Sequence, residues 1–170
     1  MTHIPHIAVA GLGLLGASIC QTLKDHKFPV KITGVSSPSS LSKALKAELI
    51  DNAVDYDDIG HLKSEVDLFI LCTPIEFIFD LIDKLATSEH PWKQNSIVTD
   101  VGSTKLEIVT FGQDQLGADR FVGGHPMAGS EKSGIEARDS TLFESALWLL
   151  CPSKEQLLPH DSLLVKLIEN

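Results

Sequence analysis

Short apolar runs alternate along the chain with longer segments in which apolar residues recur every third or fourth position. The run His6–Ala10 is almost entirely apolar and stops at a glycine, as a strand buried on both faces does. After it, Leu15, Ile19 and Leu23 are spaced four residues apart, which is the spacing of one face of a helix. The N-terminal pattern therefore predicts a strand, a tight turn and a helix.

The alternation continues to the end of the chain. Lys31–Val35 is typical of a second strand, and a serine-rich turn follows it. The next helical face is formed by Leu41, Ala44, Leu45 and Leu49. Further strands are predicted at 66–72, 96–99, 121–124 and 146–151, and further helices at 75–85, 104–109 and 163–168. Strands that alternate with helices predict an α/β fold, a doubly wound and mostly parallel Rossmann sheet with helices on both faces.

Two local patterns refine these elements. Thr104 and Glu107 have the spacing of a capping box, so we expect a helix to open there. The stretch Glu48–Asp67 holds seven acidic residues and one lysine, Lys63, which is typical of a solvated face. Within it, Val54 is expected in a minor strand.

The composition indicates a globular domain that does not bind polyanions. The chain has 170 residues, of which 43% are hydrophobic, enough to form a core. Its 23 acidic residues outnumber the 14 basic ones, and the net charge is −9. Such a charge repels phosphate backbones and argues against nucleic acid as a partner.

Cysteine usage and hydropathy indicate the compartment. Cys20, Cys72 and Cys151 each lie in an apolar run, and none of them is spaced like a pair of metal ligands. An odd number of thiols in core segments is typical of a reduced cytoplasmic protein without a metal site, although a nucleophilic or ligating cysteine is the alternative. No apolar run reaches the ~18 residues of a membrane span, so no membrane association is expected.

A glycine-rich turn follows the first predicted strand. Gly11, Gly13 and Gly16 form a G-x-G-x-x-G, in which they provide the tight turn, the close approach to a pyrophosphate and the helix-to-strand packing. The helix that starts here presents free N–H groups to phosphates. The turn predicts a dinucleotide site, and packing alone is the alternative. The residues expected at this site are Gly11, Leu12, Gly13, Leu14, Leu15 and Gly16.

The end of the second strand bears on which dinucleotide binds. NAD-binding sites carry an acid there, which accepts a hydrogen bond from the ribose 2′-hydroxyl. This chain has Ser36 and Ser37 instead, and the nearest cation is Lys43. We therefore expect NADP to be preferred, with NAD as the alternative.

Three further loops follow predicted strands, which is where open α/β sheets bind ligands. They are Cys72-Thr73-Pro74, Asp100-Val101-Gly102-Ser103-Thr104-Lys105 and the loop Gly123–Glu131. Ser103 and His125 supply a hydroxyl and an imidazole, the groups that oxidation of an alcohol needs. Taken singly, Ser103 is equally typical of a helix N-cap and His125 of a turn before proline. Lys105, Glu131 and Lys132 are by default surface charges.

Taken together, four strings resemble one family. In chain order they are GLGLLGAS, LCTP, TDVGSTK and GGHPMAGSEKSG. This set is similar to the nucleotide-binding domain of the prephenate and arogenate dehydrogenases of tyrosine biosynthesis, and the resemblance covers essentially the whole chain. Other Rossmann dehydrogenases, such as the 3-hydroxyisobutyrate enzymes, do not carry an HPMAG loop.

The resemblance implies an NAD(P)-dependent oxidative decarboxylation of prephenate or arogenate, in which a ring carbon gives a hydride to nicotinamide as carbon dioxide leaves. By the same resemblance, His125 hydrogen-bonds the ring hydroxyl and takes up its proton, and Ser103 holds that hydroxyl. Glu131 and Lys132 are candidates for contact with the substrate. Beyond the glycine turn, the cofactor-binding residues implied are Ser36, Ser37, Cys72, Thr73, Pro74, Asp100 and Gly102.

The resemblance also bears on domain organisation. We expect residues 1–170 to be one dinucleotide-binding domain, and the family's helical dimerisation domain, which supplies a carboxylate-binding arginine, to be absent from this chain. We call the chain with that expected domain the full-length protein; it is expected to be a homodimer, and the isolated domain weakly active or inactive. Two alternatives remain open, namely a dinucleotide-binding module without turnover and a Rossmann dehydrogenase of the hydroxyisobutyrate type.

Overall fold

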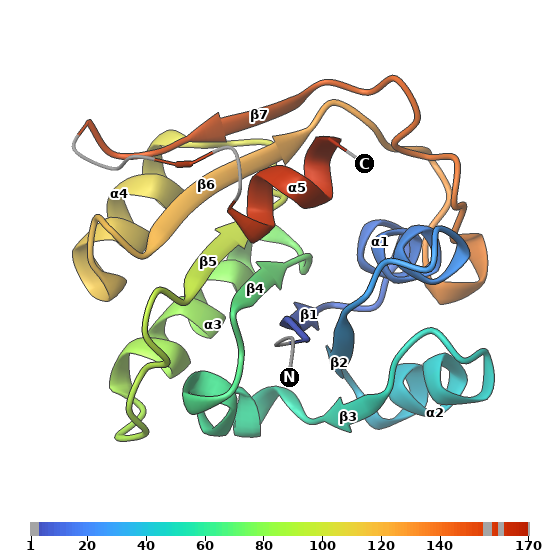
Figure 1. The fold of residues 1–170 in the computed structure, drawn as a ribbon, viewed down its shortest axis with the longest axis horizontal. Coiled ribbons are helices and arrows are strands. Elements are labelled where there is room, and N and C mark those ends of the chain that lie inside the picture. The colour runs from blue at the N-terminus through green and yellow to red at the C-terminus, as the bar shows by residue number, and fades with distance from the viewer. Residues whose placement is uncertain (1–3, 155–157, 160–161, 170) are drawn as a thin grey trace.

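The computed structural model describes residues 4–154, 158–159 and 162–169, which form one seven-stranded sheet with helices on both faces (Figure 1). The strand order is β3-β2-β1-β4-β5-β6-β7. The strands are β1 (His6–Ala10), β2 (Lys31–Val35), β3 (Asn52–Val54), β4 (Leu68–Leu71), β5 (Ile97–Asp100), β6 (Phe121–Pro126) and β7 (Trp148–Cys151). The helices are α1 (Leu14–Asp25), α2 (Pro38–Lys46), α3 (Ile75–Thr87), α4 (Leu106–Leu116) and α5 (Leu163–Glu169), with 3-10 helices η1 (Tyr56–Ser64) and η2 (Ile135–Ala137).

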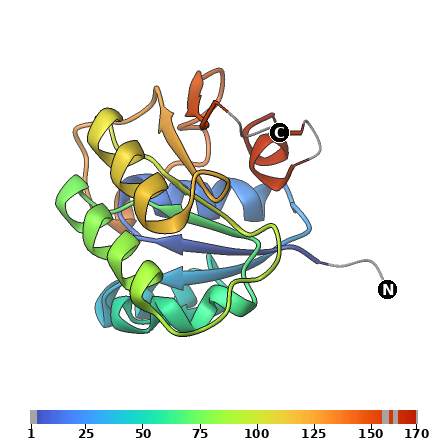
Figure 2. The same cartoon turned by 90° about the vertical axis from the view of Figure 1, so that its left-hand side faces the viewer.

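Two hydrophobic cores lie on opposite faces of the sheet. Along β1, Ile7 and Val9 point into one core, whereas Ala8 and Ala10 point into the other, because successive strand side chains alternate. Helices α1, α2 and α5 cover the first face, and η1, α3 and α4 cover the second (Figure 2). All five β1 residues are buried, as the apolar run predicted. The doubly wound α/β fold is confirmed.

The sheet is parallel from β3 to β6 and ends in an antiparallel strand. β7 pairs with β6 from Gly123↔Cys151 to Pro126↔Trp148. The sequence predicted β6 to end at Gly124, so the placement of His125 and Pro126 in a loop was wrong. Pairing with β7 extends the strand through both residues.

Helix ends differ from their predictions for local reasons. α2 ends at Lys46 because Glu48 adopts a left-handed φ of 55° and the Leu49 N–H donates to the Ala44 carbonyl. Leu49 is therefore buried beyond the helix, not within it. The predicted capping box at Thr104 is also absent, since α4 begins at Leu106 with Lys105 as its N-cap. The acidic stretch contains β3 as expected, but also η1, whose Ile59 and Leu62 pack into the second core.

Candidate functional site

The glycine turn lies against the loop after β4. Gly11 has a left-handed φ of +97°, and a Cβ there would lie 2.7 Å from the Cys72 carbonyl carbon and 2.8 Å from the Thr73 nitrogen. A Cβ at Gly16 would lie 2.0 Å from the Gly11 carbonyl oxygen. Both positions require glycine, and they bring α1 and the Cys72–Thr73–Pro74 loop to the carboxyl ends of β1 and β4.

Gly13 is different because it borders open space. Its φ is −80°, and no heavy atom lies within 4 Å of a Cβ built there. Gly13 is also the N-cap of α1, where no side chain caps the helix and no acid lies in the first turn. The first N–H groups of α1 are therefore free to bind an anion, which fits the pyrophosphate of a dinucleotide.

A cavity of about 380 Å³ opens at the loop after β4, which the glycine turn contacts through Gly11. Its walls come from η1, the β4–α3 loop and α3 and combine apolar residues with one acid and one cation; they are Tyr56, Thr73, Pro74, Phe77, Asp80, Leu81 and Lys84. The Thr73 hydroxyl is buried and has no hydrogen-bond partner among the residues that the structure describes. This combination of apolar walls and an unpartnered polar group fits a flat ring with polar edges.

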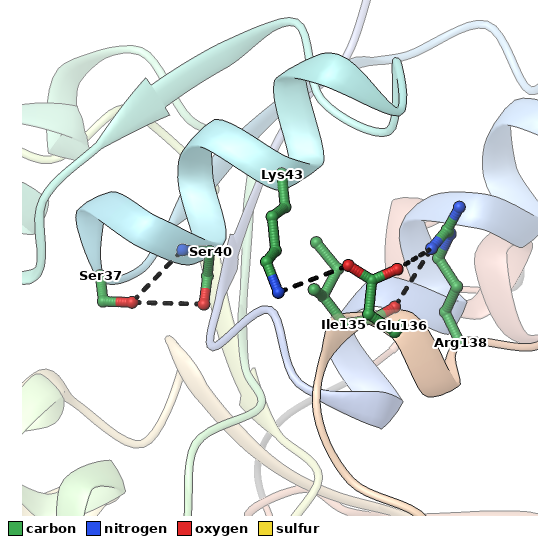
Figure 3. A network of polar contacts seen from close by, with 6 residues as sticks. All are labelled: Ser37, Ser40, Lys43, Ile135, Glu136 and Arg138. Carbon is green, nitrogen blue, oxygen red and sulfur yellow. Dashed lines mark hydrogen bonds and ion pairs between the residues drawn. The ribbon is translucent and has the colours of Figure 1, made fainter.

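The end of β2 presents hydroxyls and one cation. Ser36 is buried, with its hydroxyl 3.3 Å from the Tyr56 hydroxyl, so its side chain faces η1. Ser37 is exposed and caps α2, accepting from the Ser40 N–H at 3.5 Å and donating to the Ser40 hydroxyl at 3.2 Å. Lys43 lies farther along α2 and pairs with Glu136 (Figure 3). Of the two serines, Ser37 is the one whose side chain is open to a ligand.

A buried ion pair joins the loops that carry Ser103 and His125. The Asp100 carboxylate, fully buried at the end of β5, accepts from the Gly102 N–H at 2.8 Å, the Gly124 N–H at 3.1 Å and the Lys105 ammonium. Lys105 also donates to the Gly124 carbonyl at 2.7 Å. Burial raises the pKa of Asp100, while its bonds with Lys105 oppose that rise.

This pair fixes the two candidate catalytic residues relative to each other. Gly102 precedes Ser103 and Gly124 precedes His125. The backbone next to both candidate residues is therefore hydrogen-bonded to the same Asp100 carboxylate. Ser103 is exposed in the β5–α4 loop and is not the cap of α4, and His125 is half-buried in β6. Lys105 was expected by default at the surface, and that interpretation was wrong because its side chain is only 17% exposed.

The other predicted site residues lie apart from this pair. Glu131 and Lys132 are exposed in the segment after β6, where the Lys132 N–H donates to the Ser130 hydroxyl at 3.0 Å. Whether they contact a substrate stays a prediction. Two residues that the sequence did not single out, Tyr56 and Glu136, border the cofactor-side features described above.

Two of the three cysteines, Cys20 and Cys72, lack the features of a nucleophile. All three are free, and burial raises the pKa of Cys20 to about 12 and that of Cys72 well above its usual value. Thiols so shifted stay protonated near neutral pH, whereas the thiolate is the reactive form.

Within the described residues, no cluster of three or more histidine, cysteine or acidic residues could hold a metal ion. The described helices also include none that is long and apolar enough to cross a membrane.

Comparison with known proteins identifies a family profile and individual proteins that are similar to this chain in sequence. The profile of the family described as prephenate dehydrogenase, nucleotide-binding domain, matches residues 19–167. The chain is 39% identical over 153 residues to the prephenate dehydrogenase of Bacillus subtilis, covering 88% of this chain and 40% of that protein. It is 31% identical over 153 residues to the cyclohexadienyl dehydrogenase of Zymomonas mobilis, covering 89% of this chain and 50% of that protein. The chain thus spans half or less of the length of these relatives.

Solved structures agree with the sequence relatives. The prephenate dehydrogenase of A. aeolicus, in complex with hydroxyphenyl propionate and NAD+, superposes with a TM-score of 0.86 at 30% identity, covering 99% of this chain and 57% of that one. The arogenate dehydrogenase of Synechocystis gives a TM-score of 0.83 at 32% identity, covering 96% of this chain and 56% of that one. The resemblance found in the four sequence strings is therefore confirmed over the whole fold.

Proposed function

Because the chain belongs to the family of prephenate dehydrogenase nucleotide-binding domains, we propose that it binds a nicotinamide dinucleotide and serves the oxidative decarboxylation of prephenate or arogenate. The observation that carries the proposal is the uncapped N-terminus of α1 at Gly13, which follows the turn at Gly11 that contacts the loop after β4, where a partly apolar cavity opens. The solved relative from A. aeolicus holds NAD+, which supports the same class of cofactor here.

Different residues of the site bind different parts of the cofactor. The N–H groups after Gly13 bind the pyrophosphate, and the cavity lined by Tyr56, Thr73 and Phe77 accepts the adenine. Ser37 lies where the adenosine ribose would be recognised. When bound, the nicotinamide supplies the hydride acceptor.

His125 and Ser103 act on the substrate hydroxyl. As the ring carbon loses its hydride, the hydroxyl becomes a carbonyl, and its proton passes to the His125 imidazole. Ser103 donates to or accepts from the same oxygen and so keeps it in line with the imidazole. The ring carboxylate leaves as carbon dioxide, its bonding electrons complete the aromatic ring, and the carbonyl oxygen becomes a phenolate that takes the proton back from His125. Asp100 and Lys105 keep the two side chains in register through Gly102 and Gly124.

The substrate and partner assignments follow from the family. The substrate is a small anionic cyclohexadiene, and a chain with a net charge of −9 would bind it weakly without a further cation. We infer that the full-length protein supplies that cation and forms a homodimer through its helical domain.

The Gly13→Ala variant tests dinucleotide binding in this chain. The added methyl group meets no protein atom but fills the space into which the N–H groups of α1 point, so stability should change by less than about 1 kcal/mol. Dinucleotide affinity should fall at least about tenfold, a cost of roughly 1.4 kcal/mol. Calorimetric titration with NAD and NADP measures the affinity, and urea unfolding measures the stability.

The Gly16→Ala variant is the matched control. Its Cβ would collide with the Gly11 carbonyl, so it should lose stability as well as binding. Unchanged affinity of a folded Gly13→Ala chain for both dinucleotides would contradict the proposed site.

We also predict a modest preference for NADP over NAD, about tenfold or roughly 1.4 kcal/mol. No acid follows β2 to repel a 2′-phosphate, and no arginine is there to clamp one. Ser37→Asp, which keeps a capping residue at the start of α2, should reverse the preference, because a carboxylate at this open position repels the phosphate and accepts from the ribose hydroxyl of NAD. Parallel titrations with both cofactors measure the ratio. A clear preference of the unmodified chain for NAD, or a ratio unchanged by the substitution, counts against it.

A further inference from the structure

Glu136 lies between two cations, Lys43 of α2 and Arg138, which follows η2. Its carboxylate is 3.4 Å from the Lys43 ammonium and 3.9 Å from the Arg138 guanidinium. Figure 3 shows Lys43 extending from α2 toward Glu136, which comes from η2, about ninety residues away in sequence. An acid from the segment that follows the His125 strand therefore reaches the helix that begins at the ribose end of the cofactor site.

Lys43 lies on the same side of α2 as the exposed Ser37 and the half-buried Ser40. Ser37, Ser40 and Lys43 follow one another at intervals of three residues, so they share one side of the helix. Helical side chains lean toward the N-terminus, which directs the Lys43 ammonium over the turn that holds Ser40. A phosphate bound by the Ser37 and Ser40 hydroxyls would be within reach of this flexible amine.

Glu136 cannot easily follow Lys43 toward such a phosphate. Ile135, next to it, is 5% exposed and packs into the core on the α1 and α2 face. On the other side, Arg138 donates to the Gln21 side chain of α1 at 3.1 Å and to the Ile135 carbonyl at 3.3 Å. Anchors on both sides hold the Glu136 backbone in place while the Lys43 side chain is free to turn.

We propose that Glu136 is a specificity-determining residue, which competes with the cofactor's 2′-phosphate for Lys43 and so restrains the preference for NADP. This inference rests on the proposed dinucleotide site. A 2′-phosphate must take Lys43 from Glu136 and also approach the Glu136 charge, whereas NAD, which has only a hydroxyl there, does neither. The acid that is absent from the end of β2 is thus partly replaced by one from η2.

Glu136→Gln tests the proposal in the 170-residue chain by titration with NADP and NAD. The substitution keeps the shape of the side chain and removes its charge, so the Kd for NADP should fall about three- to tenfold while the Kd for NAD changes less than twofold. Raising the salt concentration should shrink the gain, because both charges are exposed and open to screening. Lys43→Met should weaken NADP binding and leave NAD binding unchanged.

The Lys43→Met, Glu136→Gln double variant isolates the competition. Without Lys43, the second substitution should give at most half of its effect in the unmodified chain. Glu48→Gln, which removes the same charge just beyond α2, is the matched control and should leave the ratio of the two Kd values unchanged. Equal effects on NADP and NAD, or a full Glu136→Gln effect in the Lys43→Met background, would overturn the proposal while leaving the dinucleotide site intact. If neither dinucleotide binds the unmodified chain, the proposed function itself fails, and this inference with it.

Discussion

Replacing Lys105 with methionine should lower the free energy of unfolding of the chain by about 3 to 5 kcal/mol at pH 7. The methionine fills most of the space but leaves the Asp100 carboxylate without its cation, in a position with no solvent exposure. The Gly124 carbonyl loses its lysine donor as well. A buried charge left without its partner is among the most destabilising changes that one substitution can make.

The loss should depend on pH in a defined direction. Burial raises the pKa of Asp100 in the folded chain. At a pH between the unfolded and the folded pKa, the folded chain therefore retains a proton that the unfolded chain has released. The stability from this group is complete below the usual pKa of an aspartate and is lost as the pH rises through the folded value. Removing Lys105 takes away an interaction that lowers this pKa. The variant should therefore lose less stability at pH 5 than at pH 7.

Urea unfolding at the two pH values measures both effects. The Asp100→Asn, Lys105→Met double variant, which buries no charge, should recover at least half of the lost stability. Lys84→Met is the matched control, because Lys84 pairs with the exposed Asp57 and its loss should cost at most about 1 kcal/mol. A pH-independent loss below about 1 kcal/mol for Lys105→Met would mean that the ion pair does not hold the two loops.

In the full-length protein, His125→Asn should lower kcat by about 10² to 10⁴. Loss of hydride from a carbinol carbon builds positive charge, which is relieved only if the hydroxyl proton is accepted as the bond breaks. Asparagine can hydrogen-bond the hydroxyl but cannot take its proton. KM should therefore change much less than kcat, which steady-state kinetics with prephenate and with arogenate would measure.

Ser103→Ala is the comparison for this prediction. If Ser103 only orients the hydroxyl, its loss should lower kcat less than the loss of His125 does. Retention of most of kcat in His125→Asn would make His125 a structural residue of β6. Absence of turnover in the unmodified full-length protein would favour a binding module.

Local periodicity predicted most of the fold because each parallel strand is buried on both faces and leaves a continuous apolar run. β1 and β2 were predicted to the residue for that reason. The antiparallel course of β7 carried no such signal, since a partly exposed strand has the same pattern in either direction. η1 was missed because its buried residues are spread among acids that do face solvent.

The candidate site was predictable only where the residue type itself carries the function. Glycines that need a left-handed φ or a close approach are visible in sequence, as Gly11 and Gly16 were. Lys105 was not, because its role depends on Asp100 being fully buried, which no local pattern reveals. Glu136 lies far from α2 in sequence, and only the packing of Ile135 against the first core brings it to Lys43.

The interior position of β1 in the sheet has a consequence for synthesis of the chain. β1 is made first, yet it lies between β2 and β4, and β4 does not begin until Leu68. For the translation of some sixty residues, one edge of this interior strand therefore has no partner, although all five of its residues are buried in the finished sheet. An open edge of this kind is a template for pairing with other chains. A nascent chain released before Leu71 should self-associate, whereas one released after β5 should already have closed that edge.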